Sequence, residues 1–135
     1  MKHTFEHQSL QLQQKKPLIY TAMSKHFFYF RTHISKFVLD HGGVPLNPFM
    51  IFDYFLTDTV DRGIVREANN NLVHRADELW VFGPISDGVL AEINIAKEQN
   101  KPIQYFAIEK SKTIRPISKE HVILEPDVQK YKQQL

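Results

Sequence analysis

Short apolar runs alternate with longer amphipathic stretches along most of the chain. The runs are continuous rather than alternating, which is typical of strands that a sheet buries on both faces. We therefore predict five strands, at PLIYTA (17–22), VPLN (44–47), ELWVFG (78–83), PIQYFAI (102–108) and HVILE (121–125).

Between these runs, apolar residues recur at steps of three and four, a period that indicates helices packed on the sheet. Residues 25–41, 60–75 and 87–99 carry such apolar stripes. The run FMIFDYFL (49–56) is too short for its pattern to separate helix from strand, and we expect a short helix over the sheet edge. The Lys-rich segment 110–119 is expected to be a loop.

Strands that alternate with helices at this spacing predict an α/β fold. We expect a doubly wound, three-layer sandwich, flavodoxin- or Rossmann-like, with a central parallel sheet of about five strands. The strands near 17–22, 78–83 and 102–107 should lie side by side in its centre, since they are continuously apolar. Such sheets bind ligands beyond the carboxyl ends of the strands, at the switch in strand order.

The length of 135 residues is that of one domain. We expect a flexible N-terminal arm (1–16), a single nucleotide-binding-like domain (17–126) and a polar C-terminal tail (127–135).

Composition argues against several classes of protein. A net charge of +2 without a long basic run gives no support for binding a nucleic acid polymer. The chain has no cysteine, and its seven histidines lack the spacing of metal ligands. No apolar segment approaches the roughly 20 residues that cross a bilayer, and the first residues lack the core of a signal peptide. We expect a cytoplasmic protein that uses no membrane anchor, metal or cofactor.

The loop after the strand at 78–83 carries the candidate chemistry. In PISDGVLAE (84–92), Ser86 can cap the following helix, and the amides near Gly88 favour an anion such as phosphate. Glu92 lies four residues after Gly88, so its side chain leans back over a position that has no Cβ. A ligand seated on the loop would meet this carboxylate. An ordinary capped turn followed by a solvated glutamate would give the same local pattern.

The sequence resembles the nucleoside 2-deoxyribosyltransferase-like superfamily, especially its nucleotide N-hydrolase branch, and is closer still to small single-domain relatives. The specific part of the resemblance is RADELWVFG followed by SDGVLAEINIA, and the whole spans roughly residues 17–107. Ser86 stands six residues before Glu92, as in the nucleotide-hydrolase pattern. The opening IYTAMS is similar to the family's first strand and loop, whose tyrosine and serine fall on Tyr20 and Ser24.

This resemblance implies an N-glycosidic bond hydrolase or a deoxyribosyltransferase that acts on a nucleoside or nucleotide. Glu92 would attack C1′ of the sugar, with Tyr20 and Asn69 as further catalytic residues. The substrate and its phosphate would bind at Ser24, Ser86, Asp87 and Gly88.

Two positions depart from the family pattern. An Asp is usual where this chain has Asn69, and many members have Gly where it has Met23. Asparagine can hydrogen-bond a base but cannot deliver a proton as an acid. A nucleotide-binding sensor without catalysis therefore stays an alternative, and so does an assembly module in which the loop is only a capped helix.

The aromatic run at 49–55 is too apolar to leave in water on a domain of this size. We expect a homodimer or larger homo-oligomer with this run in the contact, which the resemblance also implies. A wall that packs on a nucleobase is the alternative.

Overall fold

The computed structural model describes residues 5–135, which form one five-stranded sheet with helices around it. The strands are β1 (Leu18–Met23), β2 (Val44–Leu46), β3 (Glu78–Phe82), β4 (Ile103–Glu109) and β5 (Thr113–Ile117). Their order across the sheet is β2-β1-β3-β4-β5, and all neighbours are parallel except β4 and β5. The three strands expected at the centre, β1, β3 and β4, are adjacent and parallel, which confirms that prediction.

The sheet is mixed rather than wholly parallel because the segment predicted to be a loop contains β5. Only residues 110–112 join β4 to β5, which suffices for a hairpin but not for the long crossover of a parallel pair. Lys110 and Ser111 have φ of 55° and 51°, the left-handed conformation that tight hairpin turns require. Pro116 is compatible with β5 because this strand lies at the sheet edge. The prediction of a loop at 110–119 is therefore wrong over β5.

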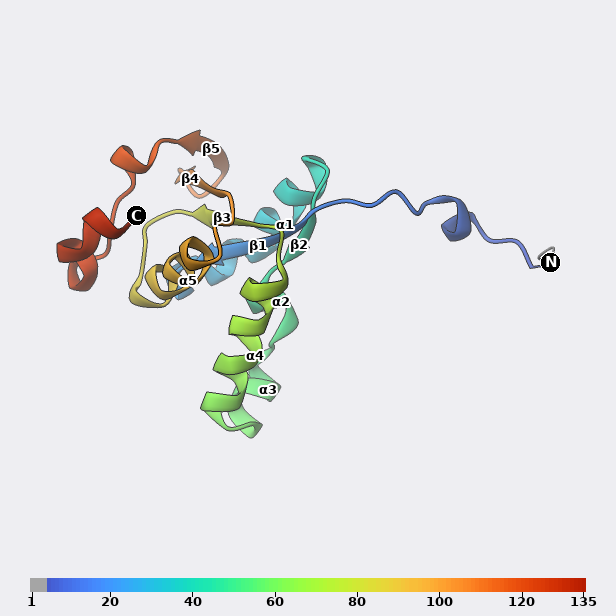
Figure 1. The fold of residues 1–135 in the computed structure, drawn as a ribbon, viewed down its shortest axis with the longest axis horizontal. Coiled ribbons are helices and arrows are strands. Elements are labelled where there is room, and N and C mark those ends of the chain that lie inside the picture. The colour runs from blue at the N-terminus through green and yellow to red at the C-terminus, as the bar shows by residue number, and fades with distance from the viewer. Residues whose placement is uncertain (1–4) are drawn as a thin grey trace.

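Helices pack on both faces of the sheet (Figure 1). The helices up to residue 98 are α1 (Arg31–Asp40), α2 (Pro48–Ile51), α3 (Tyr54–Thr59), α4 (Arg62–Arg75) and α5 (Asp87–Glu98), with the 3-10 helices η1 (Gln8–Gln11) and η2 (Lys25–Phe30). Of these, η2, α1, α4 and α5 contribute buried residues to the core. Successive residues of a strand point to opposite faces. Tyr20 and Ala22 of β1 therefore pack with α4 and α5, while Ile19 and Met23 pack with α1.

The helix predictions hold with changes in detail. Helices α4 and α5 confirm the predictions at 60–75 and 87–99. The predicted helix at 25–41 begins as the 3-10 helix η2 before it continues as α1. The segment 49–56 yields two short helices, α2 and α3, because Asn47 and Asp53 each cap a new helix start with their side chains.

The predicted strand at 121–125 is wrong. Lys119–His121 form the 3-10 helix η3, and the chain beyond it makes one isolated parallel bridge, between Ile85 and Leu124. Leu124 is buried. This segment is thus an extended chain packed on the core rather than a strand of the sheet.

The C-terminal residues fold back onto the domain. Pro126–Gln134 form the 3-10 helix η4, and its Val128 is buried. Lys97 of α5 donates a hydrogen bond to the backbone oxygen of Gln134 at 2.8 Å. The polar tail expected at 127–135 is therefore packed against α5.

The N-terminal segment differs from the rest of the chain. Residues 5–16 are exposed and extend away from the sheet (Figure 1), and the start of the expected arm, residues 1–4, lies outside the described residues. Across residues 5–135, no helix has the length and apolar character that a membrane span requires.

Candidate functional site

Three candidate residues from three elements meet between the sheet and helices α4 and α5. Tyr20 lies within β1 and is fully buried. Its hydroxyl donates a hydrogen bond to Oε2 of Glu92 in α5 and lies 2.8 Å from Oδ1 of Asn69 in α4. Nδ2 of Asn69 donates to the same Oε2 of Glu92 at 2.9 Å. The three residues predicted to be catalytic are thus brought into direct contact.

The local sequence explains this convergence. Tyr20 points to the α4 and α5 face because side chains alternate along β1. Asn69 lies four residues before the buried Val73, and Glu92 adjoins the buried Ile93, so both polar residues border the apolar stripes of their helices. The polar cluster therefore sits at the rim of the core on this face.

The two carboxylate oxygens of Glu92 have different surroundings. Both hydrogen-bond donors, the Tyr20 hydroxyl and the Asn69 amide, contact Oε2. Within residues 5–135 no donor contacts Oε1, and no buried side-chain oxygen lacks a partner, so Oε1 must reach solvent. Glu92 thus has one oxygen held by the protein and one oxygen free to meet a ligand.

Burial dominates the electrostatics of the cluster. Loss of solvation raises the pKa of Glu92 from 4.5 to about 7, although the hydrogen bonds from Tyr20 and Asn69 act in the opposite direction. Burial also raises the pKa of Tyr20 well above its ordinary value, with a further increase from the Glu92 charge. Tyr20 therefore stays a neutral hydrogen-bond donor, while Glu92 changes charge near neutral pH.

The start of α5 uses its own side chains to satisfy its amides. Oγ of Ser86 accepts a hydrogen bond from the amide of Val89 at 3.3 Å, which confirms the predicted cap. Oδ1 of Asp87 accepts from the amide of Gly88 at 2.7 Å. A Cβ added at Gly88 would meet nothing within 4 Å, so the space above it is open. A phosphate at this helix start would have to compete with the Asp87 carboxylate for the Gly88 amide.

Ser24 lies apart from the Glu92 cluster. It follows β1, is buried, and caps η2 by accepting a hydrogen bond from the amide of His26 at 3.3 Å. Its Oγ also lies 3.1 Å from Nδ1 of His26. These contacts fix the loop after β1, and no hydrogen bond in the described residues joins Ser24 to Glu92.

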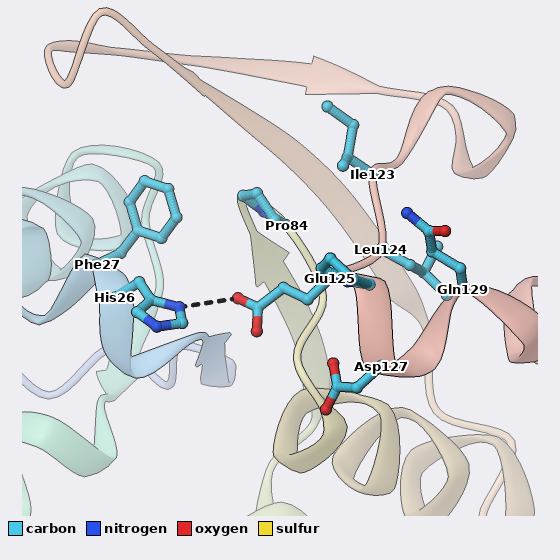
Figure 2. A pocket seen from close by; sticks show the side chains of 9 residues that line it. His26, Phe27, Pro84, Ile123, Leu124, Glu125, Asp127 and Gln129 are labelled. Atoms are coloured by element: carbon cyan, nitrogen blue, oxygen red, sulfur yellow. Dashed lines mark hydrogen bonds and ion pairs between the residues drawn. The ribbon is translucent and has the colours of Figure 1, made fainter.

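A cavity of about 660 Å³ lies at the carboxyl ends of β1 and β3, where the strand order switches (Figure 2). One wall follows β1 and one follows β3, and the outer wall comes from the C-terminal segment. The lining residues are His26, Phe27, Pro84, Ile123, Leu124, Glu125, Pro126, Asp127 and Gln129. Glu92, Ser86 and Gly88 are not among them, so the structure gives no support for Glu92 at the mouth of this cavity.

Sequence reasoning missed the outer wall of this cavity. The segment HVILE suggested a strand, whose residues would lie inside the sheet. The dipeptide Glu125-Pro126 is the signal that points the other way, because proline restricts the residue before it and ends regular pairing. Within residues 5–135, no group of three or more His, Asp or Glu side chains could hold a metal ion.

A sequence model of the family described as "Domain of unknown function (DUF7768)" matches residues 20–106. The chain belongs to this family. The DUF7768 match includes Tyr20, Asn69 and Glu92, whereas the outer wall of the cavity at 123–129 lies beyond it. No curated protein matches the chain. Since the DUF7768 description states no activity, the chemistry must be argued from the site.

Proposed function

We propose that this DUF7768 protein cleaves the N-glycosidic bond of a nucleoside or nucleotide, with Glu92 as the nucleophile that attacks C1′ of the sugar. The observation that carries the proposal is the asymmetric environment of the Glu92 carboxylate. Oε2 receives hydrogen bonds from Tyr20 and Asn69, and Oε1 reaches solvent. A nucleophilic carboxylate needs this arrangement, because one oxygen must be oriented and the other must reach the sugar carbon.

The reaction would proceed in two displacements at C1′. Attack by Oε1 breaks the bond from C1′ to the base nitrogen, and the electron pair of that bond leaves with the base, which takes a proton. Water or the nitrogen of a second base then attacks C1′ and releases the Glu92 carboxylate. Asn69 cannot supply the proton, and the raised pKa of Tyr20 makes its hydroxyl a poor acid. The proton therefore comes from solvent or from a group outside this cluster.

The raised pKa of Glu92 gives the proposal a pH signature. Only the carboxylate is a nucleophile, so kcat/KM should rise with pH as Glu92 loses its proton near pH 7. A rise of kcat/KM near pH 7 would be unusual for a solvated glutamate, whose pKa lies near 4.3.

The finer fold assignment belongs to the same proposal. We place the chain with the doubly wound, flavodoxin- or Rossmann-like folds and, within them, with the nucleoside 2-deoxyribosyltransferase-like superfamily. The order of the four parallel strands, β2-β1-β3-β4, supports this placement. Ser24, Ser86, Asp87 and Gly88 remain predicted substrate contacts at the ends of β1 and β3.

The decisive experiment compares wild type with Glu92→Gln. Each protein is incubated with deoxynucleosides and their 5′-monophosphates, and free base is measured by liquid chromatography. Wild type should release a base, and Glu92→Gln should bind the same ligand without release because an amide is a poor nucleophile. Glu98→Gln, which removes a carboxylate from the exposed far end of α5, is the matched control and should behave as wild type.

A catalytically inactive nucleotide sensor is the second candidate function, and the observation that favours it is Asn69. The side chain at this position hydrogen-bonds Glu92 but cannot act as an acid. Binding of nucleosides or nucleotides by wild type, with no base released at any pH between 5 and 9, would favour the sensor. Absence of binding would contradict both candidates.

The predicted homo-oligomer also stays a proposal, and the exposed apolar surface supports it. Met50, Ile51, Tyr54 and Phe55 are 50%, 41%, 67% and 70% exposed, on helix α2, which packs against α1, and helix α3, which packs against α4. Several exposed large apolar side chains on two consecutive helices are typical of a subunit contact. Light scattering that gives only a 15.9 kDa species at tens of micromolar would contradict it.

A further inference from the structure

The cavity at the ends of β1 and β3 has a size and a position that suit a small ligand. Its volume of about 660 Å³ falls within the range of small-molecule sites. It opens where the strand order switches, which is where open α/β sheets bind ligands. Glu92 lies five residues after the first residue of α5, about 7.5 Å along the helix axis. Glu92 does not line the cavity, so a nucleoside bound there would have to extend its sugar along the start of α5 to meet this carboxylate.

The outer wall of the cavity is held in place by the backbone. The amide of Ile85 donates to the oxygen of Ile123, and the amide of Glu125 donates to the oxygen of Ile85, each at 2.9 Å. Leu124 and Val128 on either side of Glu125 are buried. The side chains that face the cavity from this segment are thus presented from a fixed backbone.

Two of the four polar side chains in the lining, Glu125 and Asp127, are carboxylates, and the other two, His26 and Gln129, can donate as well as accept hydrogen bonds. Glu125 has a side chain that is 19% exposed, and its Oε2 pairs with Nδ1 of His26 at 3.1 Å. No donor within residues 5–135 contacts Oε1 of Glu125, so that oxygen is available to a ligand. Figure 2 shows the carboxylate of Asp127 above the helix that follows Pro84, on the same side of the cavity. The lining contains no lysine or arginine.

The apolar groups of the lining suit a flat ring. Phe27, Pro84 and Ile123 come from three separate segments of the lining, and Figure 2 shows Pro84 between the other two. An aromatic ligand gains contact area from such side chains, and its polar edge can then meet the carboxylates.

Phosphate is a poor match for the same region. Asp127 and Glu125 carry negative charge in the cavity lining, and the Gly88 amide at the start of α5 already donates to Asp87. Like charges repel, and a phosphate would also have to replace the contact between Asp87 and the Gly88 amide.

We propose that this cavity binds the base of an unphosphorylated nucleoside, and that the carboxylates of Glu125 and Asp127 accept hydrogen bonds from an amino group of that base. This inference rests on the proposed function, since it names the substrate class that the proposed reaction would use. It assigns base recognition to a segment, residues 123–129, that the DUF7768 match does not include.

Two matched ligand pairs test the amino group, with dissociation constants measured by calorimetry. Deoxyguanosine carries an amino group where deoxyinosine has a hydrogen, and deoxycytidine carries an amino group where deoxyuridine has a carbonyl oxygen. At least one amino-bearing nucleoside should bind wild type, and it should bind roughly tenfold or more tightly than its partner, because a hydrogen bond to a charged acceptor is lost. Equal binding within each pair, or no binding of any of the four, would overturn the proposal.

The 5′-monophosphate of the bound nucleoside tests the charge. Wild type should bind the monophosphate more weakly than the nucleoside, and Asp127→Asn should narrow that difference by removing repulsion. Glu125→Gln should lower the preference for the amino-bearing base. Glu98→Gln removes the same charge far from the cavity. It should change neither the preference for the nucleoside over its monophosphate nor the preference for the amino-bearing base. A wild type that prefers the monophosphate would contradict the proposal.

This inference and the proposed function can fail separately. Selective binding of an amino-bearing nucleoside without base release would leave the cavity assignment standing and exclude catalysis by Glu92. Base release from monophosphates in preference to nucleosides, abolished in Glu92→Gln, would keep the proposed function and overturn the cavity assignment.

Discussion

The two faces of the sheet bury different kinds of side chain. On the α1 face, Trp80, Phe82 and Phe106 pack as rings, with centroids 5.0 Å apart for Phe82 and Phe106 and 5.2 Å apart for Trp80 and Phe106. On the α4 and α5 face, the apolar core continues but ends at the Tyr20 hydroxyl and the Glu92 carboxylate. The α1 face buries aromatic rings together with the neutral polar Thr21 and Asn47, and the other face accommodates an ionisable group.

The difference separates the side chains that stabilise the fold from the ionisable side chain at the candidate site. Stacked aromatic side chains bury large areas and stabilise the folded state. A half-buried carboxylate costs free energy unless its partners compensate, and the raised pKa of Glu92 indicates that its two donors do not compensate fully. Perturbed ionisable groups of this kind concentrate at functional sites.

Truncation on the aromatic face should be the most destabilising change. Phe106 is 4% exposed and contacts rings on both sides, so Phe106→Ala should lower the free energy of unfolding by about 3–5 kcal/mol. Ile64→Ala is the control, because Ile64 is 63% exposed and its truncation should cost less than about 0.5 kcal/mol. Urea denaturation measures both. A loss below about 1 kcal/mol for Phe106→Ala would contradict the assignment of this face as the stabilising one.

The sequence predicted the centre of this fold better than its edge. Strands β1, β3 and β4 are continuous apolar runs, and burial on both faces leaves little alternative to that pattern. The edge strand β5 was missed, since TIRPI contains an arginine and a proline and follows a lysine-rich turn. Edge strands are polar because one side meets water, so their sequences resemble loops. The run at 121–125 gave the opposite error, because burial of a single extended segment produces the same apolar signal as a strand.

The candidate site was predictable in part. Helical spacing placed Glu92 on the face toward Gly88, and the resemblance drew attention to Tyr20 and Asn69. The direct contacts among these residues depend on the packing angle between α4 and α5, which no local pattern encodes. The competition between Asp87 and a phosphate was not foreseen either, since it depends on the side-chain conformation of a residue that also fits an ordinary helix start.

The second prediction concerns the pH dependence that Glu92 contributes to stability. Below pH 4.5 Glu92 is protonated in both states and contributes no penalty. Between pH 4.5 and about 7 the unfolded chain loses the proton while the folded chain keeps it, so stability falls as pH rises. Above pH 7, the free energy of unfolding should be lower by about 3 kcal/mol than below pH 4.5, as far as Glu92 contributes to it.

Glu92→Gln isolates this effect, because an amide does not titrate. The difference in unfolding free energy between Glu92→Gln and wild type should shift in favour of the variant as pH rises from 5 to 8. Urea denaturation at several pH values measures it, and contributions from all other groups cancel in the subtraction. Glu98→Gln should show no such trend. A difference that stays constant with pH would mean that Glu92 is solvated like any surface glutamate.

The smallest effect should come from the hydroxyl that links the sheet to Glu92. The hydrogen bond from Tyr20 lowers the pKa of Glu92, so Tyr20→Phe should move that pKa above 7. A hydrogen bond to a charged group is worth roughly 1.5–3 kcal/mol. Its loss should therefore raise the pKa of Glu92 by roughly one to two. Carbon-detected NMR titration of the glutamate side chains measures the change.

Tyr105→Phe is the matched control, because Tyr105 is buried on the same face but makes no hydrogen bond to Glu92 within the described residues. If the two variants give the same Glu92 pKa, the short contact between Tyr20 and Glu92 does not hold in solution. A selective increase in Tyr20→Phe would instead mean that β1 sets the charge of Glu92, and the pH limb proposed for catalysis should then move upward by the same amount in that variant.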